Sequence, residues 1–166
     1  MMETTVPDAD AETPLNDDQR KALGSLAKRF VDGESFATIF EVGEGYLEMA
    51  EQRAYELYQH GRYEDARTIA LGVIALEPAR YYPYLLIGDI ELKQLSVQQA
   101  RIYLQAAYDR APDRVPVLAK MGEVCLRSGA TDDGCDFLAQ VVGLIDDENN
   151  PHRRRAQALL RVCAEE

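Results

Sequence analysis

The feature of this sequence that most restricts its fold is a short internal repeat. Three pairs of identical residues lie 34 positions apart and a fourth pair lies at twice that spacing: Ala66 and Ala100, Pro78 and Pro112, Gly88 and Gly122, and Gly61 and Gly129. Repeats of this length each form one small unit, and neighbouring units stack to bury a continuous core. The sequence therefore predicts a stack of similar units.

Glycine and proline divide each repeat into two helices. In the first repeat we expect one helix over about 46–60 that ends at Gly61, and a second over 63–76 that ends before Pro78. Glycine is a good left-handed C-cap, and proline cannot continue a helix. The same pattern recurs along the chain, so that the repeats span 47–80, 81–114 and 115–148.

A helix pair of this length is the unit of tetratricopeptide repeats. We therefore expect an all-α fold of three tandem tetratricopeptide-type helix pairs, arranged in a right-handed superhelix over residues 46–148. Small residues recur where the two helices of a pair would approach closely, at Gly88 and Gly122 in the first helix and at Ala66 and Ala100 in the second. A bulky side chain there would force the helices apart.

Polar residues predict where several helices begin. Asn16 with Gln19, and Ser96 with Gln99, are typical of capping boxes. Thr131 is a candidate cap for the second helix of repeat three. Asn150 before Pro151 indicates the start of a last helix.

Both ends of the stack need a lid, because each repeat leaves an apolar edge. A C-terminal capping helix is expected within 149–166, with Ala156 and Leu160 on its inner face and Arg153–Arg155 on its solvated face. A helical segment over 16–45 precedes the repeats, and either caps repeat one or forms the seam of a homodimer. Residues 1–15 are expected to be a disordered acidic tail.

The charge of the chain excludes some partners. The formal net charge is −11, and the segment 1–19 is acidic and contains no Lys or Arg. Nucleic acid is therefore not expected as a partner, because phosphate binding needs a basic surface. No apolar stretch is long enough for a membrane span, and the N-terminus does not resemble a secretory signal. We expect a cytoplasmic protein.

Catalytic and cofactor motifs are not apparent in the sequence. The two histidines, His60 and His152, have no nucleophile at a motif spacing, and the three cysteines form no C-x-x-C pair. Gly43-Glu44-Gly45 lacks the lysine and the preceding strand of a phosphate loop. The sequence predicts neither an enzyme, nor a metal site, nor a cofactor.

A peptide-binding groove is the expected functional site. In stacked helix pairs the first helix of each repeat lines the concave wall, usually through its second, fifth, ninth, twelfth and thirteenth positions. The candidate groove residues from these positions are Tyr55, Tyr58, Gln59, Tyr82, Leu85, Asp89, Leu92, Lys93, Glu123, Leu126 and Arg127. The tyrosines and leucines would form apolar pockets, and Gln59, Lys93 and Arg127 would bond a peptide backbone. Alternatively, some of these tyrosines belong to the core.

Several short motifs resemble one known family. Leu47-Glu48, Ala54-Tyr55, Tyr58-Gln59, Gly61 and Tyr63-Glu64-Asp65-Ala66 resemble repeat one of the class II type III secretion chaperones, which serve translocator proteins. Phe30-Val31-Asp32-Gly33 and the segment 36–40 are similar to the entry segment of that family. The resemblance covers roughly residues 25–145.

The resemblance implies a cytoplasmic chaperone that holds an extended segment, with spaced proline and leucine, of an apolar exported protein before secretion. It also implies that Tyr55, Tyr58 and Leu85 lie in the groove, and that the N-terminal helix often mediates dimerisation. Leu86, Asp89, Leu92 and Ala70 depart from the family pattern. The alternative is a repeat adaptor that bridges subunits of an assembly. A clamp for a C-terminal carboxylate is disfavoured because Glu51 stands where a cation would be needed.

Overall fold

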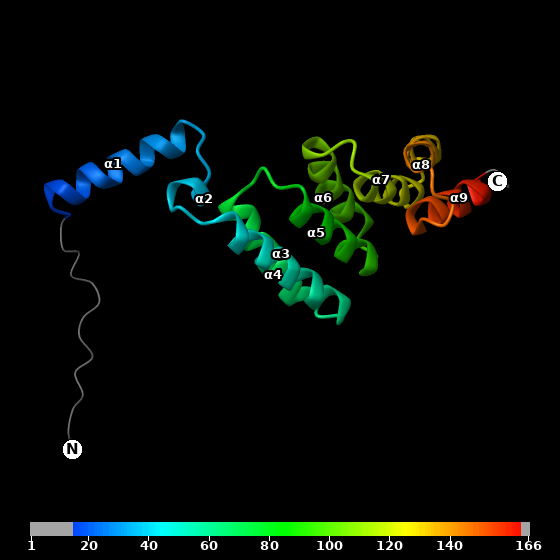
Figure 1. Ribbon diagram of the computed structural model, residues 1–166, viewed down its shortest axis with the longest axis horizontal. Coiled ribbons are helices and arrows are strands. Elements are labelled where there is room, and N and C mark those ends of the chain that lie inside the picture. The colour runs from blue at the N-terminus through cyan, green and yellow to red at the C-terminus, as the bar shows by residue number, and fades with distance from the viewer. Residues whose placement is uncertain (1–14, 164–166) are drawn as a thin grey trace, which may run out of the picture.

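The computed structural model describes residues 15–163, and within them all regular secondary structure is helical (Figure 1). The helices are α1 (Asp17–Val31), α2 (Phe36–Ile39), α3 (Glu44–Gln59), α4 (Tyr63–Leu76), α5 (Tyr82–Lys93), α6 (Val97–Arg110), α7 (Val115–Arg127), α8 (Thr131–Leu144) and α9 (Pro151–Cys163). None of the described helices is long and apolar enough to cross a membrane.

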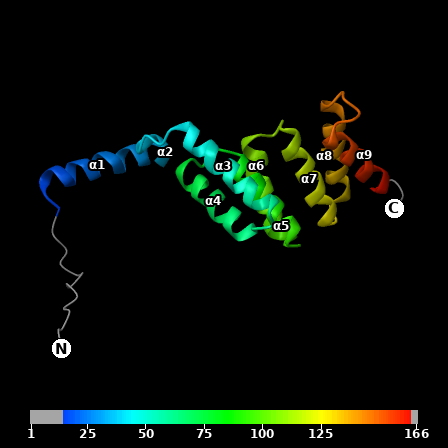
Figure 2. The ribbon, with the colours of Figure 1, turned by 60° about the horizontal axis from the view of Figure 1, so that its bottom comes forward.

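Three helix pairs, α3–α4, α5–α6 and α7–α8, form the stack expected from the repeat (Figure 2). The helix boundaries follow the glycines and prolines of the sequence. Gly61 and Gly129 follow the first helices of repeats one and three and adopt the left-handed backbone conformation, with φ of 74° and 82°. The two helices expected in repeat one are found as α3 and α4, although α3 begins slightly earlier than expected, at Glu44. The all-α prediction of three helix pairs with flanking helices is confirmed.

In repeats two and three the two helices approach closely because a glycine on the first helix lacks a side chain, and in repeat one the small, fully buried Ala54 holds the equivalent position. A Cβ atom on Gly88 would lie 2.6 Å from Cγ of Leu104, and one on Gly122 would lie 2.7 Å from Cγ of Leu138. Ala66 and Ala100 are fully buried on the opposing helices. Gly134 occupies the corresponding slot in repeat three, against Leu126. These small residues set the spacing of each pair.

The N-terminal lid is α2, and α1 lies apart from the repeats. Ala37 of α2 is buried in a cluster with Leu47 of α3 and Val73 of α4. Oγ of Ser35 donates a hydrogen bond to Glu77 at 2.5 Å, which fixes α2 to repeat one. In contrast α1 has no buried residue and projects away from the stack (Figure 1). Within this segment, therefore, α2 packs against repeat one and α1 does not.

The C-terminal helix α9 packs across α7 and α8. Ala156 is buried with Leu118 and Leu138, and Oδ1 of Asn150 accepts the backbone N–H of His152 at 2.9 Å. The expected N-cap and inner face of this helix are therefore present.

The expectation that Arg153–Arg155 form a solvated face is wrong for Arg153, which is partly buried, whereas Arg154 and Arg155 are exposed. The guanidinium of Arg153 donates to the carbonyl of Val142 at 3.0 Å and also to the carbonyl of Ile145, so it holds the connection that follows α8. Arg155 turns toward the concave side of the repeats, where it pairs with Glu123. Only Arg154 remains a solvent-facing residue without such a role.

Two expected helix caps are absent. Ser96 precedes α6 but makes no side-chain capping bond, because its backbone is not extended (ψ 65°), whereas Asn16 (ψ 169°) forms the expected capping box with Gln19. Thr131 is the first residue of α8, and Ala130 occupies the N-cap position. A tight turn between paired helices leaves these positions without the extended backbone that a capping side chain requires.

Overpacking a pair should destabilise the fold. We expect Ala100→Leu to lower the free energy of unfolding by roughly 1–3 kcal/mol, because the fully buried Ala100 leaves no room for a larger side chain. Ala139→Leu is the matched control, since Ala139 is exposed on α8. Urea unfolding followed by far-ultraviolet circular dichroism measures both. Equal stability of the two variants would contradict the assigned helix contact.

Candidate functional site: a concave groove

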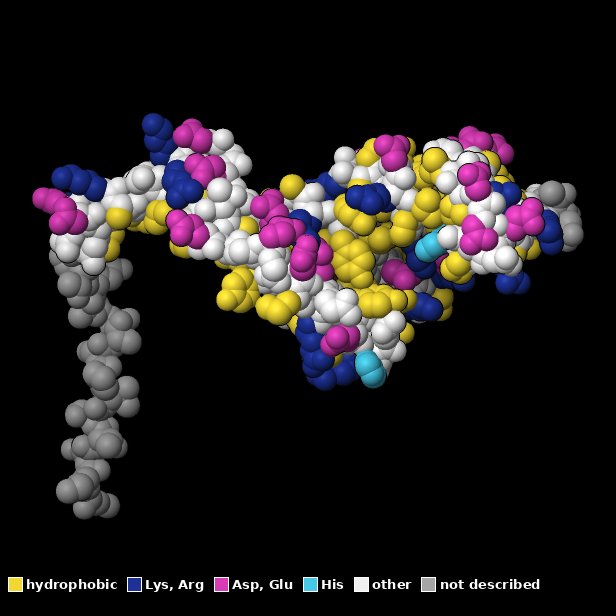
Figure 3. Space-filling view, in the orientation of Figure 1, with side chains coloured by type: hydrophobic (Ala, Val, Ile, Leu, Met, Phe, Trp, Pro, Cys, Tyr) yellow, Lys and Arg dark blue, Asp and Glu magenta, His cyan; other side chains and the backbone are white. Residues whose placement is uncertain are grey.

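The concave side of the stack contains two adjoining hollows of about 590 and 440 Å³. Tyr55 of α3 and Tyr82 of α5 line both, so the hollows form one groove. Figure 3 shows this face, with apolar side chains at the centre of the molecule and charged side chains around them. The groove begins beside Glu48 on α3 and reaches Arg155 on α9.

Four repeat positions supply the groove wall in all three repeats. Positions two, five, six and nine of each repeat line it. These residues are Glu48, Glu51, Gln52 and Tyr55 in repeat one, Tyr82, Leu85, Leu86 and Asp89 in repeat two, and Pro116, Ala119, Lys120 and Glu123 in repeat three. Because α3, α5 and α7 are related by the sequence repeat, equal positions present their side chains to the same side. The lining of the groove therefore follows from the sequence repeat.

Tyrosines dominate the repeat-one side of the groove. The ring of Tyr55 stacks on Tyr58, with centroids 6.1 Å apart, and Tyr58 also contacts Tyr63 at 5.8 Å. Tyr55 keeps 38% of its surface exposed. An exposed and rigid aromatic surface of this kind binds apolar groups at a small cost in conformational entropy.

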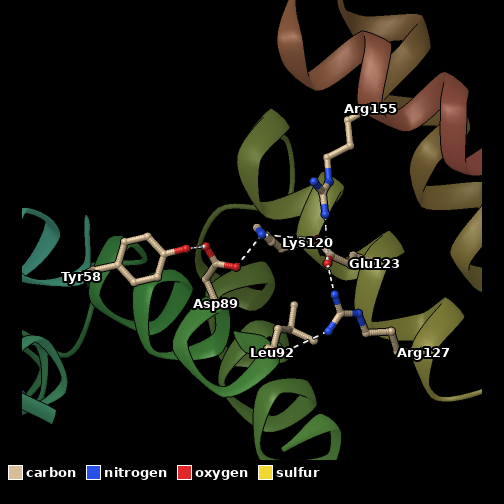
Figure 4. A network of polar contacts seen from close by, with 7 residues as sticks. All are labelled: Tyr58, Asp89, Leu92, Lys120, Glu123, Arg127 and Arg155. Carbon is tan, nitrogen blue, oxygen red and sulfur yellow. Dashed lines mark hydrogen bonds and ion pairs between the residues drawn. The ribbon is translucent and has the colours of Figure 1, made fainter. Parts of the chain in front are cut away.

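A chain of polar contacts crosses the groove floor (Figure 4). The hydroxyl of Tyr58 donates to Oδ2 of Asp89 at 2.6 Å, and Nζ of Lys120 pairs with Oδ1 of the same carboxylate. Nζ of Lys120 also lies 3.3 Å from Glu123. These contacts join the first helices of all three repeats.

Glu123 is the point where α9 joins this network (Figure 4). Arg127 pairs with it at 2.7 Å and also donates to the carbonyl of Leu92 at 2.9 Å. Arg155 of α9 contacts the same carboxylate oxygen at 3.1 Å. The C-terminal helix is therefore both a lid on the core and a wall of the groove.

The other end of the groove is acidic. The guanidinium of Arg80 binds both carboxylate oxygens of Glu51, at 2.6 and 2.9 Å, and also pairs with Glu44. Glu48 is exposed and forms no ion pair with any described residue. Arg80 thus faces three carboxylates at this end.

The hydroxyls of two tyrosines in the groove, Tyr58 and Tyr82, have raised pKa values. Burial, and next the hydrogen bond to Asp89, raise the pKa of Tyr58 above its ordinary value of 10.0. Burial, with the neighbouring Tyr55 and Glu51, raises the pKa of Tyr82 to about 12. Both side chains remain neutral hydroxyls near neutral pH, and Tyr58 acts there as a hydrogen-bond donor.

The structure brings together six of the residues expected to form the groove: Tyr55, Tyr58, Tyr82, Leu85, Asp89 and Glu123. Leu92 is only 2% exposed and belongs to the core, and Leu126 packs against Gly134. Gln59 and Lys93 are exposed but lie outside the lining, and Arg127 supports Glu123 from the rim. Apart from Tyr58, positions twelve and thirteen turn away from the groove.

The lining residues that sequence reasoning missed include Gln52, Leu86 and Lys120 from the repeats and His152 and Arg155 from α9. The first three occupy the sixth position of their repeats, so the repeat register contained the signal for them. His152 and Arg155 come from α9, which lies outside the repeats, and their approach to the groove depends on how α9 packs.

No family model matches this sequence, and no curated protein matches it. Solved structures do share its fold, which is that of tetratricopeptide-repeat proteins. The translocator chaperone SycD of Yersinia enterocolitica is 20% identical, with a TM-score of 0.67, and the match covers 78% of this chain and 98% of SycD. SycD in complex with a peptide of the translocator YopD matches at 19% identity and a TM-score of 0.64, over 75% and 97% of the two chains.

Two further structures show the range of proteins with this fold. PcrH from Pseudomonas aeruginosa, in complex with the chaperone-binding region of PopD, is 19% identical over 75% of this chain and 95% of PcrH, with a TM-score of 0.64. The second tetratricopeptide domain of human RPAP3, in complex with an HSP70 peptide, is 18% identical over 75% and 100% of the two chains, with a TM-score of 0.63. At these identities the likeness is one of fold.

The raised pKa of Tyr58 predicts a pH-dependent effect of Tyr58→Phe. Near pH 7 the loss of the bond to Asp89 should destabilise the protein by about 1 kcal/mol. Above about pH 10 an unfolded tyrosine ionises while Tyr58 stays protonated, so the wild type loses up to about 1.4 kcal/mol per pH unit at this residue and the variant does not. The stability gap should therefore shrink as the pH rises through about 10.

Urea unfolding at about pH 7, 9 and 11 measures that gap. Tyr46→Phe is the control, because Tyr46 lies on the same helix and is largely exposed, and its gap should stay near zero throughout. A gap for Tyr58→Phe that is constant with pH would refute the raised pKa of Tyr58.

Proposed function

We propose that this protein is a peptide-holding chaperone that binds an extended, largely apolar segment of an exported protein in the concave groove before export. The observation that carries the proposal is the continuous groove whose centre is formed by Tyr55, Tyr82 and Leu85, with polar groups on its floor and ends. The complexes of SycD with a YopD peptide and of PcrH with a region of PopD, which share this fold, support it.

The groove suits an extended ligand for a physical reason. An extended segment presents alternate side chains to one surface and leaves its backbone N–H and C=O groups unpaired. The aromatic and aliphatic wall would take the side chains. Gln52, Lys120 and Arg155 would satisfy backbone groups, and they replace Gln59, Lys93 and Arg127, which lie outside the lining. The proposed contact set therefore comprises the residues at repeat positions two, five, six and nine, with Tyr58 and Arg155.

The proposed role is non-catalytic and cytoplasmic. The proteins of like fold named above are chaperones and a peptide-binding domain, and holding a segment before export requires no chemistry. For the organisation of the chain we propose residues 16–45 as the N-terminal segment, 46–148 as the repeats and 149–166 as the capping segment. The expected acidic tail, 1–15, lies almost wholly outside the described residues.

The N-terminal segment supports a second contact surface. Phe30, Phe36 and Phe40 form an exposed aromatic cluster, with centroid distances of 4.8 and 6.1 Å between successive rings. Leu23 of α1 is exposed as well. Exposed apolar surface away from the core is typical of an interface. We propose that this cluster forms a homodimer seam, and an adaptor role through the same surface is the alternative to the chaperone function.

The groove mechanism predicts that Tyr55→Ala lowers the affinity for a bound segment by on the order of 2 kcal/mol, about thirtyfold, since a desolvated tyrosine at the centre of a groove is a typical hot spot. Tyr46→Ala is the matched control on the same helix, because Tyr46 is 70% exposed and does not line the groove. Tyr46→Ala should change the affinity for the segment by no more than about twofold.

The ligand for this test is the protein captured from the native host by the full-length chain and identified by mass spectrometry. Its protected segment is made as a capped peptide and titrated calorimetrically against the wild type and both variants. If the segment bound to Tyr55→Ala with unchanged affinity, and a change on α1 abolished capture, the adaptor role would replace the chaperone role.

The dimer proposal predicts that Phe30→Glu converts the protein to a monomer, because a charge would be buried in the seam. Ser25→Glu adds the same charge elsewhere on α1 and should leave the dimer intact. Size-exclusion chromatography with light scattering gives the mass of each full-length protein. A wild type that is monomeric at all concentrations tested would rule out the seam.

A further inference from the structure

The two ends of the groove carry opposite charge. At the α9 end three cations face two carboxylates, and these residues are Lys120, Arg127 and Arg155 against Asp89 and Glu123. At the repeat-one end Arg80 faces three carboxylates, Glu44, Glu48 and Glu51, and Arg114 lies over the ring of Tyr81 at 5.8 Å, so the carboxylates still outnumber the cations. A ligand that spans the groove therefore experiences a change of sign along its length.

At the α9 end the carboxylates are largely buried, whereas the guanidinium of Arg155 is exposed to solvent. Glu123 is 6% exposed and receives Lys120, Arg127 and Arg155, so it has little capacity for a further partner. The side chain of Arg155 is 61% exposed and uses one nitrogen, Nη2, for its contact with Glu123. A guanidinium has five donors, so Arg155 can bind a second carboxylate without leaving the first.

At the repeat-one end the exposed charged group is the carboxylate of Glu48. Arg80 is occupied by Glu51 and Glu44, and its side chain is 19% exposed. Glu48 lines the groove with no cation paired to it among the described residues. A ligand carboxylate placed here would meet like charge, which is unfavourable even in a partly solvated site.

We propose that the groove selects a charge-ordered segment, in which an acidic side chain lies at the α9 end against Arg155 and apolar side chains lie over Tyr55, Tyr82 and Leu85. This proposal rests on the proposed function and specifies its substrate class: the held segment carries an Asp or Glu on one side of its apolar core. Arg155 is the specificity-determining residue, and Glu48 opposes the reversed order.

The size of the preference follows from the exposure of Arg155. Exposed ion pairs contribute less than about 1 kcal/mol, which corresponds to at most about fivefold in affinity. We expect a preference of about three- to fivefold at low salt. Screening should reduce it toward unity at about 1 M salt, where the Debye length is about 3 Å.

Three capped peptides test the proposal against the full-length chain. They share one core of spaced proline and leucine with serine between them, and they carry Asp at the N-terminal end, Asp at the C-terminal end, or Asn at both ends. Fluorescence anisotropy gives the affinity of each. One of the two Asp peptides, and not the other, should bind about three- to fivefold more tightly than the Asn peptide, and the end that carries its Asp gives the direction of the bound chain. Equal gains for both Asp peptides would contradict the charge order.

Two variants assign the preference to Arg155. Arg155→Glu should abolish or reverse the ratio of the affinities of the Asp and Asn peptides, with both peptides measured against the same variant so that a general loss of binding does not change the ratio. Arg154→Glu makes the same charge change on the preceding, solvent-facing residue and should retain the preference. Thermal unfolding of each variant confirms that α9 remains packed.

The outcomes separate this proposal from the proposed function. If the Asn peptide binds and neither Asp peptide binds more tightly, charge selection is wrong and the groove function stands. Equal losses in Arg154→Glu and Arg155→Glu would reduce the effect to net charge and would also overturn the proposal. If no peptide binds to the wild type, the proposed function fails and this inference fails with it.

Discussion

The close contact between the two helices of each pair is the interaction on which the rest of this structure depends. Gly88 and Gly122 allow Leu104 and Leu138 to pack directly against the first helix, and the buried Ala66 and Ala100 leave room from the other side. A small residue holds this position in every repeat, since Ala54 takes the place of the glycine in repeat one, and the first helices α3, α5 and α7 therefore stack in the same way. The concave groove exists because those three helices present the same positions to the same side.

The polar network on the groove floor adds a connection that hydrophobic packing alone does not provide. The contacts from Tyr58 through Asp89, Lys120 and Glu123 to Arg155 join three repeats and the C-terminal helix in one chain of hydrogen bonds and ion pairs. Partly buried carboxylates require such partners, since an unpaired charge would be costly. The network therefore connects the groove floor across the three repeats, and the tyrosines beside it provide the apolar surface of the groove.

The N-terminal segment divides into two parts with different physical roles. α2 buries Ala37 and Ile39 and closes the apolar edge of repeat one. α1 has a regular capping box but buries nothing, so intrachain packing does not explain its apolar face. The proposed seam, formed by the aromatic cluster of α1 and α2, shares no residue with the lining of the groove, so the protein could use the two surfaces independently.

The sequence by itself determined the repeat, the helix boundaries and the helix contacts, because glycine and proline act on the local backbone and the repeat period propagates that effect. It also placed Tyr55, Tyr82 and Leu85 on one face, since position within a helix decides direction. Only the tertiary structure decided that Leu92 is buried and that Arg155 reaches Glu123. Those outcomes depend on the angles at which neighbouring helices and α9 pack, and these angles arise from contacts between residues distant in sequence.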